Sequence, residues 1–500
     1  MSGVYGRFAV QGATLRGVEA VPVDVEVVVG SGIPAFCIVG MPDAAVQEAR
    51  ERVRAALRAT GFSMPNERVV VNLAPGSLRK TGSGFDLPIA VSLLAATGQV
   101  DPRVAEGALF VGELSLEGAV RPVDGLLAYA LRARDLGARL VCAAAPERLV
   151  AIDGLELRAA RTLADFRTGE FAALAPVRPS RTRASLDFRD VAGHDMAKRA
   201  LQIAAAGRHG VLMMGPPGSG KTMLASRLPS ILPPLEEDEA LEAALIHSVA
   251  GEDVGSLLGG ARPFRSPHHS ATTAGLVGGG TPPRPGEISL AHHGVLFLDE
   301  LPEFRPSVLQ GIRQPMESGR VTVTRADGNV SFPARFMLVA AANPCPCGYY
   351  GDAERACSCT LAQVSTYQNR IGGPLVDRID LHIDVRRILP RDVLGTGGGT
   401  SSDDMRAAVL GAREYASWRR ARAGDDGSAE ALVRSCAMAA DDEGFFEDAA
   451  RAARMSGRAI MRTLAVARTV ADMEEAASVN RGHLCEALAF RLREGVGPCG

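Results

Sequence analysis

Apolar residues along positions 1–172 follow two spacings, one typical of strands and one typical of helices. The segments 23–29 and 68–73 are rich in valine and predict strands. From 43 to 60 the apolar residues recur at helical spacing and predict an amphipathic helix. Its buried face consists of Val46, Ala49, Val53, Ala56 and Leu57. A buried helix is predicted over 87–96, so we expect an α/β domain with its own core.

Short apolar runs return between residues 187 and 394. The runs 210–214, 294–298 and 339–342 are typical of buried strands in a parallel sheet, and a helical pattern follows the first of them. From 403 to 500 alanine-rich helical patterns dominate, and no strand is predicted. The predicted fold class is therefore α/β, with a parallel sheet in the central part and helices alone at the end.

Two breaks divide the chain. Residues 175–183 are rich in proline and polar side chains, and residues 395–402 are rich in glycine and serine. We predict four parts: a first α/β domain over 1–172, a linker over 173–186, a central domain over 187–394 and a helical lid domain over 403–500.

Composition limits the classes of function. The 500 residues carry a net charge of −2, so no basic field covers the whole molecule and any nucleic-acid contact must be local. The N-terminus lacks the features of a signal peptide, and no apolar run reaches membrane-spanning length. We therefore expect a cytoplasmic protein without membrane contact, whose nine cysteines are thiols or metal ligands.

A complete G-x-x-x-x-G-K-[ST] pattern lies between the strand 210–214 and the helix that follows it. Glycines in such a loop let backbone N–H groups close around phosphate oxygens, and the helix start adds a positive dipole end. Lys221 is expected to reach the β- and γ-phosphates of ATP, and the Thr222 hydroxyl to hold Mg²⁺. The loop consists of Gly215, Pro216, Pro217, Gly218, Ser219, Gly220, Lys221 and Thr222.

Two further strand ends supply groups that hydrolysis needs. The run 294–298 leads to Asp299, which can organise Mg²⁺, and to Glu300, which can polarise the attacking water as a general base. The run 339–342 leads to Asn343, whose amide can position that water. A strand-end asparagine is by itself more often a cap or turn residue, but its place after the acidic pair favours the catalytic role.

These motifs together resemble those of AAA+ ATPases. The segments 265–270, 286–292 and 301–304 are similar to the magnesium-chelatase-like branch, and nearly the whole chain resembles its YifB/ComM family. The resemblance implies a ring-forming ATPase, a homohexamer, that uses ATP and Mg²⁺. In the ComM members it implies a helicase that drives branch migration of DNA during recombination. It does not imply porphyrin chemistry.

The resemblance also assigns arginines to the ATP site. The segment 375–380 is similar to one that carries a finger reaching the neighbouring subunit's nucleotide, which points to Arg378, with Arg370 as the alternative. A planar, permanent cation suits the charge that develops on a transferred phosphoryl group. Arg458 resembles the second sensor, which touches the γ-phosphate. Without the family pattern, either arginine would be assigned to the surface.

DNA contacts are expected where subunits converge on the channel of a ring, because the net charge leaves no broad basic surface. Alternation around Asp327-Gly328 predicts a hairpin over 320–332, and Arg325 beside its turn is the first candidate. An exposed surface arginine is the alternative. Residues 251–291 resemble an insert that faces the channel and supply Arg262 and Arg265.

Four cysteines fall into two C-x-C pairs. Cys345, Cys347, Cys357 and Cys359 can close a tetrahedral Zn²⁺ site. Plain thiols are the alternative, because the spacing is tighter than in common zinc motifs. The histidine pairs 268–269 and 292–293 suggest zinc more weakly, since adjacent histidines lack helical spacing.

Segments 79–88 and 111–125 resemble the Lon protease domain and the part of it that carries its nucleophile. The expected serine falls on Gly84 or Asp86, and the expected lysine falls on Leu127. A serine without a lysine to deprotonate it is a poor nucleophile. We therefore expect a Lon-protease-like fold, of the ribosomal-S5 type, without protease chemistry.

The leading hypothesis is an ATP-driven DNA motor. The second is an AAA+ ATPase that remodels proteins, with the N-terminal domain as an adaptor, since such rings translocate both polymers. A magnesium chelatase subunit is a distant third, because metal insertion needs large partner subunits.

Overall fold

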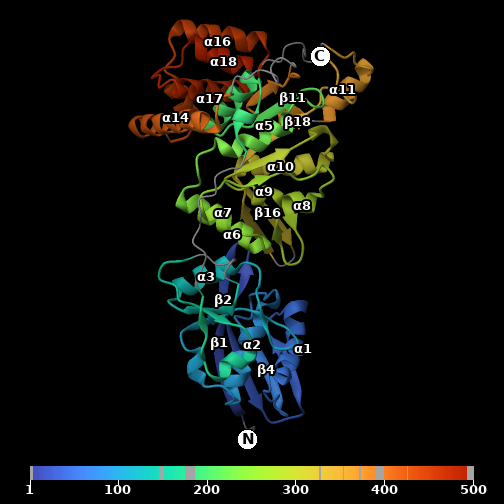
Figure 1. Cartoon of the computed structure of the whole chain (residues 1–500), viewed down its shortest axis with the longest axis vertical. Coiled ribbons are helices and arrows are strands. Elements are labelled where there is room, and N and C mark those ends of the chain that lie inside the picture. The colour runs from blue at the N-terminus through green and yellow to red at the C-terminus, as the bar shows by residue number, and fades with distance from the viewer. Residues whose placement is uncertain are drawn as a thin grey trace.

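The computed structural model describes residues 4–145, 151–174, 186–325, 328–352, 354–370, 373–388, 399–424 and 426–491. The chain is elongated: an N-terminal unit (4–174) lies at one end, a central unit (186–388) in the middle and a lid unit (399–491) at the other end (Figure 1). Most of the predicted linker and part of the glycine-rich joint lie outside the described residues, so the predicted boundaries stay predictions. In the described part, no helix is long and apolar enough to cross a bilayer.

An eight-stranded sheet, in the order β10-β9-β8-β5-β1-β2-β4-β3, forms the N-terminal unit. Its long strands β1 (Val4–Arg16) and β2 (Glu19–Gly30) pair antiparallel, and β2 pairs with β4 (Arg68–Ala74). The remaining elements are β3 (Ala35–Val39), β5 (Ala108–Phe110), β6 (Glu113–Leu114), β7 (Val120–Arg121), β8 (Arg139–Ala143), β9 (Leu157–Ala160), β10 (Ala172–Ala173), α1 (Ala44–Ala59), α2 (Asp86–Ala96) and α3 (Leu126–Asp135).

The predicted helices of this unit are confirmed. Helix α1 begins where the Asp43 carboxylate accepts a hydrogen bond from the Val46 N–H at 2.9 Å. All five residues of its predicted apolar face are fully buried. Helix α2 covers the predicted run 87–96, and its apolar residues are buried on every side, which explains why the sequence shows no polar face there.

The central unit is built on a five-stranded sheet in the order β12-β15-β18-β11-β19, in which all neighbouring strands are parallel. The three predicted strands are β11 (Val211–Met214), β15 (Val295–Leu298) and β18 (Met337–Ala342), and β12 (Phe264–Arg265) and β19 (Leu381–Asp384) flank them. Because the strands are parallel, β11, β15 and β18 end at one edge of the sheet.

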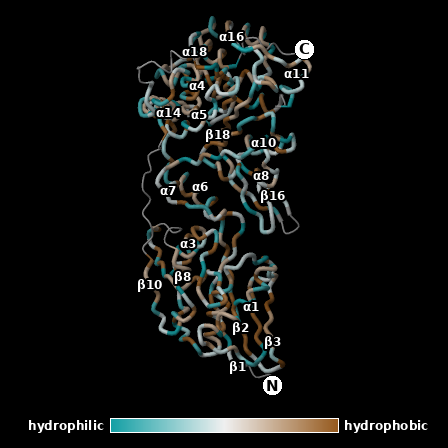
Figure 2. Tube along the Cα trace, turned by 45° about the vertical axis from the view of Figure 1, so that its right-hand side comes forward, coloured by the Kyte–Doolittle hydropathy of each residue, from teal (hydrophilic) through white to brown (hydrophobic). Residues whose placement is uncertain are grey.

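Each of these strands is buried on both faces. Val211 and Met213 pack into a core with α4 and the lid unit, while Leu212 and Met214 pack into a second core beneath α10 and the hairpin β16–β17. The strands therefore read as continuous apolar runs rather than as alternating ones. The trace coloured by hydropathy shows hydrophobic stretches in all three units (Figure 2).

Short elements fill the rest of the central unit, and the predicted hairpin is β16–β17. The elements are α4 (Asp195–Gly207), α5 (Lys221–Arg227), α6 (Glu237–Ala250), α7 (Gly255–Leu258), α8 (Thr273–Val277), β13 (Gly278–Gly279), β14 (Arg284–Pro285), α9 (Glu287–Leu290), α10 (Pro306–Ser318), β16 (Arg320–Arg325), β17 (Gly328–Pro333), α11 (Leu361–Arg370) and α12 (Gly373–Val376). The lid unit consists of helices in its described part: α14 (Ser402–Ala423), α15 (Ala429–Cys436), α16 (Ala440–Ala452), α17 (Gly457–Met473) and α18 (Arg481–Ala489).

The N-terminal unit docks on the central unit through backbone and side chain. The N–H groups of Gly125 and Leu127, at the start of α3, donate to the carbonyl oxygen and the hydroxyl of Ser248 on α6, at 2.7 and 3.1 Å. At the tip of the β1–β2 turn, Val18 packs against the core beneath the β16–β17 hairpin. The hairpin predicted to face DNA therefore rests on the N-terminal unit.

Candidate functional site

The phosphate loop joins β11 to α5, as its motif requires. Gly218 and Gly220 have φ values of +75° and +88°, a region that only glycine adopts readily. Lys221 turns back over the loop, and its Nζ donates to the carbonyl oxygens of Gly215 and Pro216 at 2.8 and 2.9 Å. Burial lowers the pKa of Lys221, and the charges of Asp299 and Glu300 oppose that shift. These contacts hold a cation in the centre of the loop.

The predicted Mg²⁺ ligands lie in contact with each other. Thr222 Oγ1 donates to Asp299 Oδ2 at 2.6 Å, so the hydroxyl that starts α5 meets the carboxylate that follows β15. A hydroxyl and a carboxylate are the hard oxygen ligands that Mg²⁺ binds together with phosphate. The donor set therefore fits a nucleotide-bound magnesium ion.

Asn343 completes the same edge. Strand β18 lies between β15 and β11, with Met214 paired to Ala342 and Leu298 paired to Ala340. Asn343 Oδ1 accepts a hydrogen bond from Lys221 Nζ at 3.2 Å. The structure thus brings together the phosphate loop, the acidic pair and the strand-end amide that the sequence predicted separately.

Glu300 has a partner that sequence reasoning missed. Its backbone is left-handed, with φ of 52°, and its Oε2 lies 3.3 Å from His269 Nδ1. The His269 ring also meets Phe304 edge-on, with ring centroids 6.5 Å apart. Because β12 pairs parallel with β15, the residues that follow β12 emerge at the same edge as Glu300. The sequence offered only an adjacent histidine pair as a signal.

The two predicted ATP-site arginines share one carboxylate. Arg378 donates to Glu317 Oε1 from Nε at 2.9 Å, and Arg458 Nη2 lies 3.5 Å from the same oxygen. Glu317 lies in the last turn of α10, in the central unit. It therefore connects Arg458 of the lid unit to Arg378, which follows α12. Any nucleotide that one arginine reaches must lie close to the other. Arg370, the alternative finger, ends α11 and lines a groove with Glu303 and Tyr367.

Two of the three arginines predicted to contact DNA bind other groups inside the fold. Arg262 has a side chain only 6% exposed, and it donates to Glu239 and to the carbonyl oxygens of Pro233, Pro234 and His293. Because its donors are already used inside the fold, Arg262 is a weak candidate, and its contact with DNA stays a prediction.

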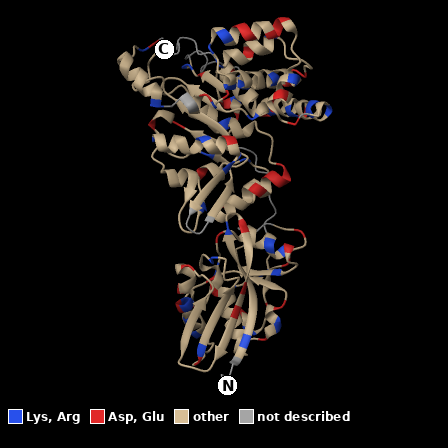
Figure 3. Ribbon diagram, turned by 180° about the vertical axis from the view of Figure 1, so that it is seen from behind, with Lys and Arg blue, Asp and Glu red and all other residues tan. Residues whose placement is uncertain are grey.

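Arg265 is also engaged. It binds Glu287 through two nitrogens, at 2.7 and 2.8 Å, and Glu252 through a third at 3.0 Å, so it holds the insert together and is a poor candidate for DNA. The side chain of Arg325 lies outside the described residues, and only its backbone pairing with Gly328 is described. Lys and Arg are interspersed with Asp and Glu over the ribbon (Figure 3), which agrees with the absence of a broad basic field in the sequence.

The four predicted cysteines converge. Their sulfur atoms all lie within 4.8 Å of one another, and Cys345 is buried. Backbone N–H groups of Tyr349 and Ser358 donate to Cys347 and lower the pKa of its thiol to about 5, whereas desolvation and the neighbouring sulfurs raise the pKa of Cys357 and of Cys359. Hydrogen bonds of this kind stabilise the thiolate form that binds metal. The cluster fits one tetrahedral Zn²⁺ ion.

A second group of potential ligands, Glu242, His292 and His293, does not fit a metal. Both Nε2 atoms lie near Glu242 Oε2, at 3.0 and 2.9 Å. However, His292 Nδ1 accepts a hydrogen bond from the Arg335 N–H at 2.9 Å, so the proton of this neutral ring must sit on Nε2. A protonated Nε2 donates to Glu242 and cannot ligate. Burial lowers the pKa of His292 to about 4, which keeps the ring neutral.

Among the described residues, no lysine Nζ is hydrogen-bonded to a serine hydroxyl. The chain contains three lysines, Lys80, Lys198 and Lys221, and each donates to backbone carbonyl oxygens: those of Gly40 and Pro75, of Val191, and of Gly215 and Pro216. The side chain of Leu127, at the expected lysine position, is buried.

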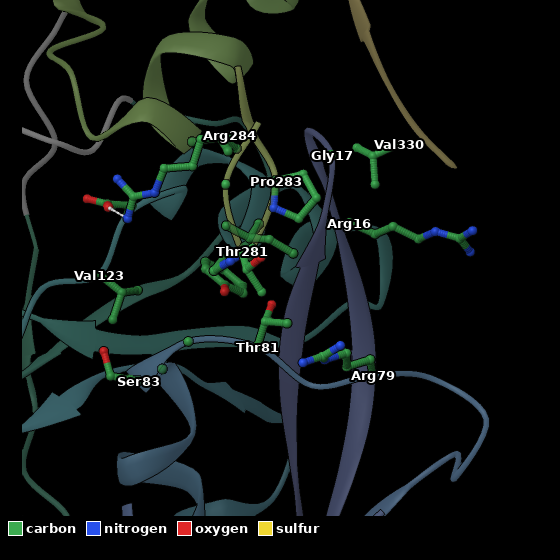
Figure 4. Close-up of a pocket in the computed structure, with 18 of the residues that line it drawn as sticks. Arg16, Gly17, Arg79, Thr81, Ser83, Val123, Thr281, Pro283, Arg284 and Val330 are labelled. Atoms are coloured by element: carbon green, nitrogen blue, oxygen red, sulfur yellow. Dashed lines mark hydrogen bonds and ion pairs between the residues drawn. The ribbon is translucent and has the colours of Figure 1, made fainter. Parts of the chain in front are cut away.

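Asp86, one of the two positions at which the serine is expected, has a structural role. Asp86 is fully buried, and Arg52 binds both of its oxygens, at 2.6 and 2.9 Å. Ser83 instead donates to Glu113 and lines a pocket of about 690 Å³ between the N-terminal and central units, where Arg284 reaches across to Asp124 (Figure 4). The described residues that line the pocket include Glu113 but no lysine, so the Lon-type dyad is not formed there.

Comparison with known proteins defines the class. Family models described as "Magnesium chelatase, subunit ChlI", "Subunit ChlI of Mg-chelatase" and "Magnesium chelatase, subunit ChlI C-terminal" match residues 187–393, 25–146 and 399–491. The chain is 42% identical to "Uncharacterized protein YifB" of Salmonella typhimurium and 43% identical to "Competence protein ComM" of Haemophilus influenzae, over 95% of each chain. It is therefore a magnesium-chelatase-like AAA+ protein.

Within that class, the chain belongs to the YifB/ComM family. The "Magnesium-chelatase 67 kDa subunit" of Chlorobaculum parvum is 34% identical over only 31% of this chain and 23% of that protein. The likeness to that subunit is therefore confined to a part of the chain.

The contact between His269 and Glu300 generates a prediction. His269→Ala should lower the turnover number for ATP about tenfold and leave ATP affinity unchanged, because the ring orients Glu300 without touching the phosphate loop. His268→Ala is the comparison: His268 Nδ1 contacts Ser270 at 2.8 Å rather than Glu300, and its ring centroid lies 4.0 Å from that of His269, so this variant removes packing on His269 but not the contact with Glu300. Steady-state hydrolysis and nucleotide titration measure both effects. Equal turnover in the two variants would show that His269 does not position the glutamate.

Proposed function

We propose that the protein is an ATP-hydrolysing, ring-forming motor that acts on DNA, as a branch-migration helicase in recombination or natural transformation. The observation that carries the proposal is the convergence of Lys221, the Thr222–Asp299 pair, Glu300 and Asn343 at one edge of a parallel sheet. Membership of the YifB/ComM family supports it, and one relative is named a competence protein. The proposal places the protein in the cytoplasm.

The residues have separate roles in this proposal. The loop Gly215–Thr222 cradles the phosphates, and Lys221 leaves its carbonyl partners to neutralise the β- and γ-phosphates. Thr222 and Asp299 hold Mg²⁺, which offsets charge on the phosphate oxygens. Glu300 takes the proton of the attacking water, and Asn343 orients that water. We also propose a structural Zn²⁺ ion in the four-cysteine cluster as a further cofactor of the protein.

The shared carboxylate suggests how subunits cooperate. The ion pair with Glu317 fixes the direction of the Arg378 guanidinium in advance, and the Arg378 side chain is 14% exposed. We assign Arg378 to the nucleotide of the neighbouring subunit in a homohexamer, and place Arg458 beside it. Binding of that nucleotide would draw both arginines from Glu317 and so couple the lid unit to the state of the next site.

Only the family membership favours DNA over protein as the translocated polymer. We propose that the hairpin β16–β17 contacts the DNA. Because the hairpin leads directly into β18 and Asn343, movement at the nucleotide would reach its tip. A protein-remodelling ATPase remains the second candidate, and a chelatase subunit is weaker because the relative named so matches 31% of the chain.

The function is tested by ATP hydrolysis with and without single-stranded, duplex and branched DNA. We expect at least one DNA form to stimulate hydrolysis. Lys221→Ala should abolish ATP binding, while Glu300→Gln should bind ATP and stall, because the two residues act in binding and in water activation. If no DNA form stimulates the wild type, the protein-remodelling function is favoured. Wild-type affinity and turnover in Lys221→Ala would contradict the site itself.

The DNA contact is tested at the hairpin. Arg325→Ala should weaken DNA binding and reduce the slope of log affinity against log salt, because fewer counterions are released, while hydrolysis without DNA is spared. Arg265→Ala serves as a contrast, since its ion pairs with Glu252 and Glu287 predict a loss of stability instead. An unchanged affinity and salt slope in Arg325→Ala would move the contact elsewhere.

The assembly is tested with Arg378→Ala, which should retain ATP binding and lose turnover by about a thousandfold, because its target belongs to the next subunit. Mixing Arg378→Ala with Lys221→Ala subunits should restore part of the activity, since some interfaces then join an intact loop to an intact finger. Arg370→Ala is the parallel variant for the alternative finger. Normal hydrolysis by Arg378→Ala would exclude that arginine.

A further inference from the structure

The four-cysteine cluster is formed by two short segments of one long loop. Cys345 Sγ lies 3.3 Å from Cys347 Sγ and 3.7 Å from Cys357 Sγ, and Cys347 and Cys357 are 3.5 Å apart at sulfur. A disulfide needs about 2.05 Å between sulfurs, so these cysteines are thiols. Cys359 contributes the fourth sulfur, within 4.8 Å of the others.

The loop that carries the cluster has no regular secondary structure in its described part, and its other contacts include Arg387, which lies 3.5 Å from Asp352 and over the Tyr349 ring. Between the end of β18 at Ala342 and the start of α11 at Leu361, the described residues contain no helix or strand. Closing such a loop costs conformational entropy, which a metal ion bound at its two ends can offset. Gln368 on α11 adds one hydrogen bond, from Nε2 to the Pro344 carbonyl at 3.0 Å.

The cluster packs directly against the phosphate loop. Gly348 follows the first cysteine pair, its N–H donates to the Cys345 carbonyl at 2.9 Å, and its φ is +84°. A Cβ atom placed on Gly348 would lie 2.4 Å from Cδ of Pro217, in the middle of the phosphate loop. The same segment begins at Asn343, which contacts Lys221. The cysteine loop therefore touches the nucleotide site at two points.

We infer that Cys345, Cys347, Cys357 and Cys359 bind one Zn²⁺ ion, and that the metal-bound loop supports the phosphate loop through the contact of Gly348 with Pro217. ATP affinity then depends on the metal although the metal never meets the nucleotide. The cysteines are metal ligands, and Gly348 is a positioning residue. The inference rests on the proposed function in one respect, that ATP binds at this phosphate loop.

Metal content is the first measurement. The purified wild-type chain should hold one zinc per subunit by elemental analysis, and Cys357→Ser/Cys359→Ser should lose it. That double variant should bind a fluorescent ATP analogue about tenfold more weakly or worse, the range seen when support of a metal site is removed. Cys485→Ser is the control, since Cys485 is exposed on α18 and outside the cluster, and it should keep both zinc and affinity.

The contact itself is tested with the zinc ligands intact. Gly348→Ala should retain zinc and the wild-type melting temperature within a few degrees, but bind the analogue about tenfold more weakly, because the new Cβ displaces Pro217. Gly351→Ala is the matched control. Gly351 has φ of +78° and nothing within 4 Å of its added Cβ, so it carries the same backbone strain without the contact.

Each outcome decides a different claim. A wild-type protein that is free of zinc, folded and active would overturn the metal site, and so would full zinc in the double cysteine variant. Equal affinities in Gly348→Ala and Gly351→Ala would overturn the contact. If the double variant does not fold, removal of zinc from the wild type with a zinc-selective chelator replaces it, and unchanged affinity after removal contradicts the inference. A zinc-loaded wild type that fails to bind ATP would instead contradict the proposed function.

Discussion

The parallel direction of five strands is the constraint on which the rest of the structure depends. Because β11, β15 and β18 run the same way, the residues after each strand meet at one edge, where Lys221 contacts Asn343 and Thr222 contacts Asp299. The same rule brings His269 to Glu300, since β12 joins the sheet in the same direction. Reversing a single strand would separate these groups by the length of the sheet.

Neighbouring elements hold this edge from two sides, because the cysteine loop packs on Pro217 and the insert reaches Glu300. The lid unit meets the central unit at Glu317, which lies with Gly294 and Met337 at the opposite edge of the sheet. The N-terminal unit lies at the opposite end of the molecule from the lid, and its β1–β2 turn meets the hairpin at Val330 and Ser331 (Figure 1). A change at the nucleotide can therefore reach the hairpin through β18, and the hairpin rests on the N-terminal unit.

Local signals in the sequence predicted a large part of the fold and of the ATP site. Helix α1 and its five buried residues follow from helical spacing, and the phosphate loop, the acidic pair and Asn343 follow from motifs at strand ends. The cysteine cluster followed from two closely spaced pairs. The sequence could not predict partners that are distant in the chain. Arg262 looked like an exposed cation, but Glu239 on α6 and three carbonyl oxygens bury it. Likewise, nothing local indicates that Arg378 and Arg458 share Glu317.

The central claim is that ATP turnover at this edge moves DNA strands. The most direct measurement is strand movement in a synthetic branched DNA whose arms are homologous, followed by gel separation of the products. The account predicts ATP-dependent branch migration by the wild type, no migration with ADP, and none by Glu300→Gln, which binds ATP but does not hydrolyse it. Rapid ATP hydrolysis by the wild type, with no strand movement on any branched DNA, would contradict the account.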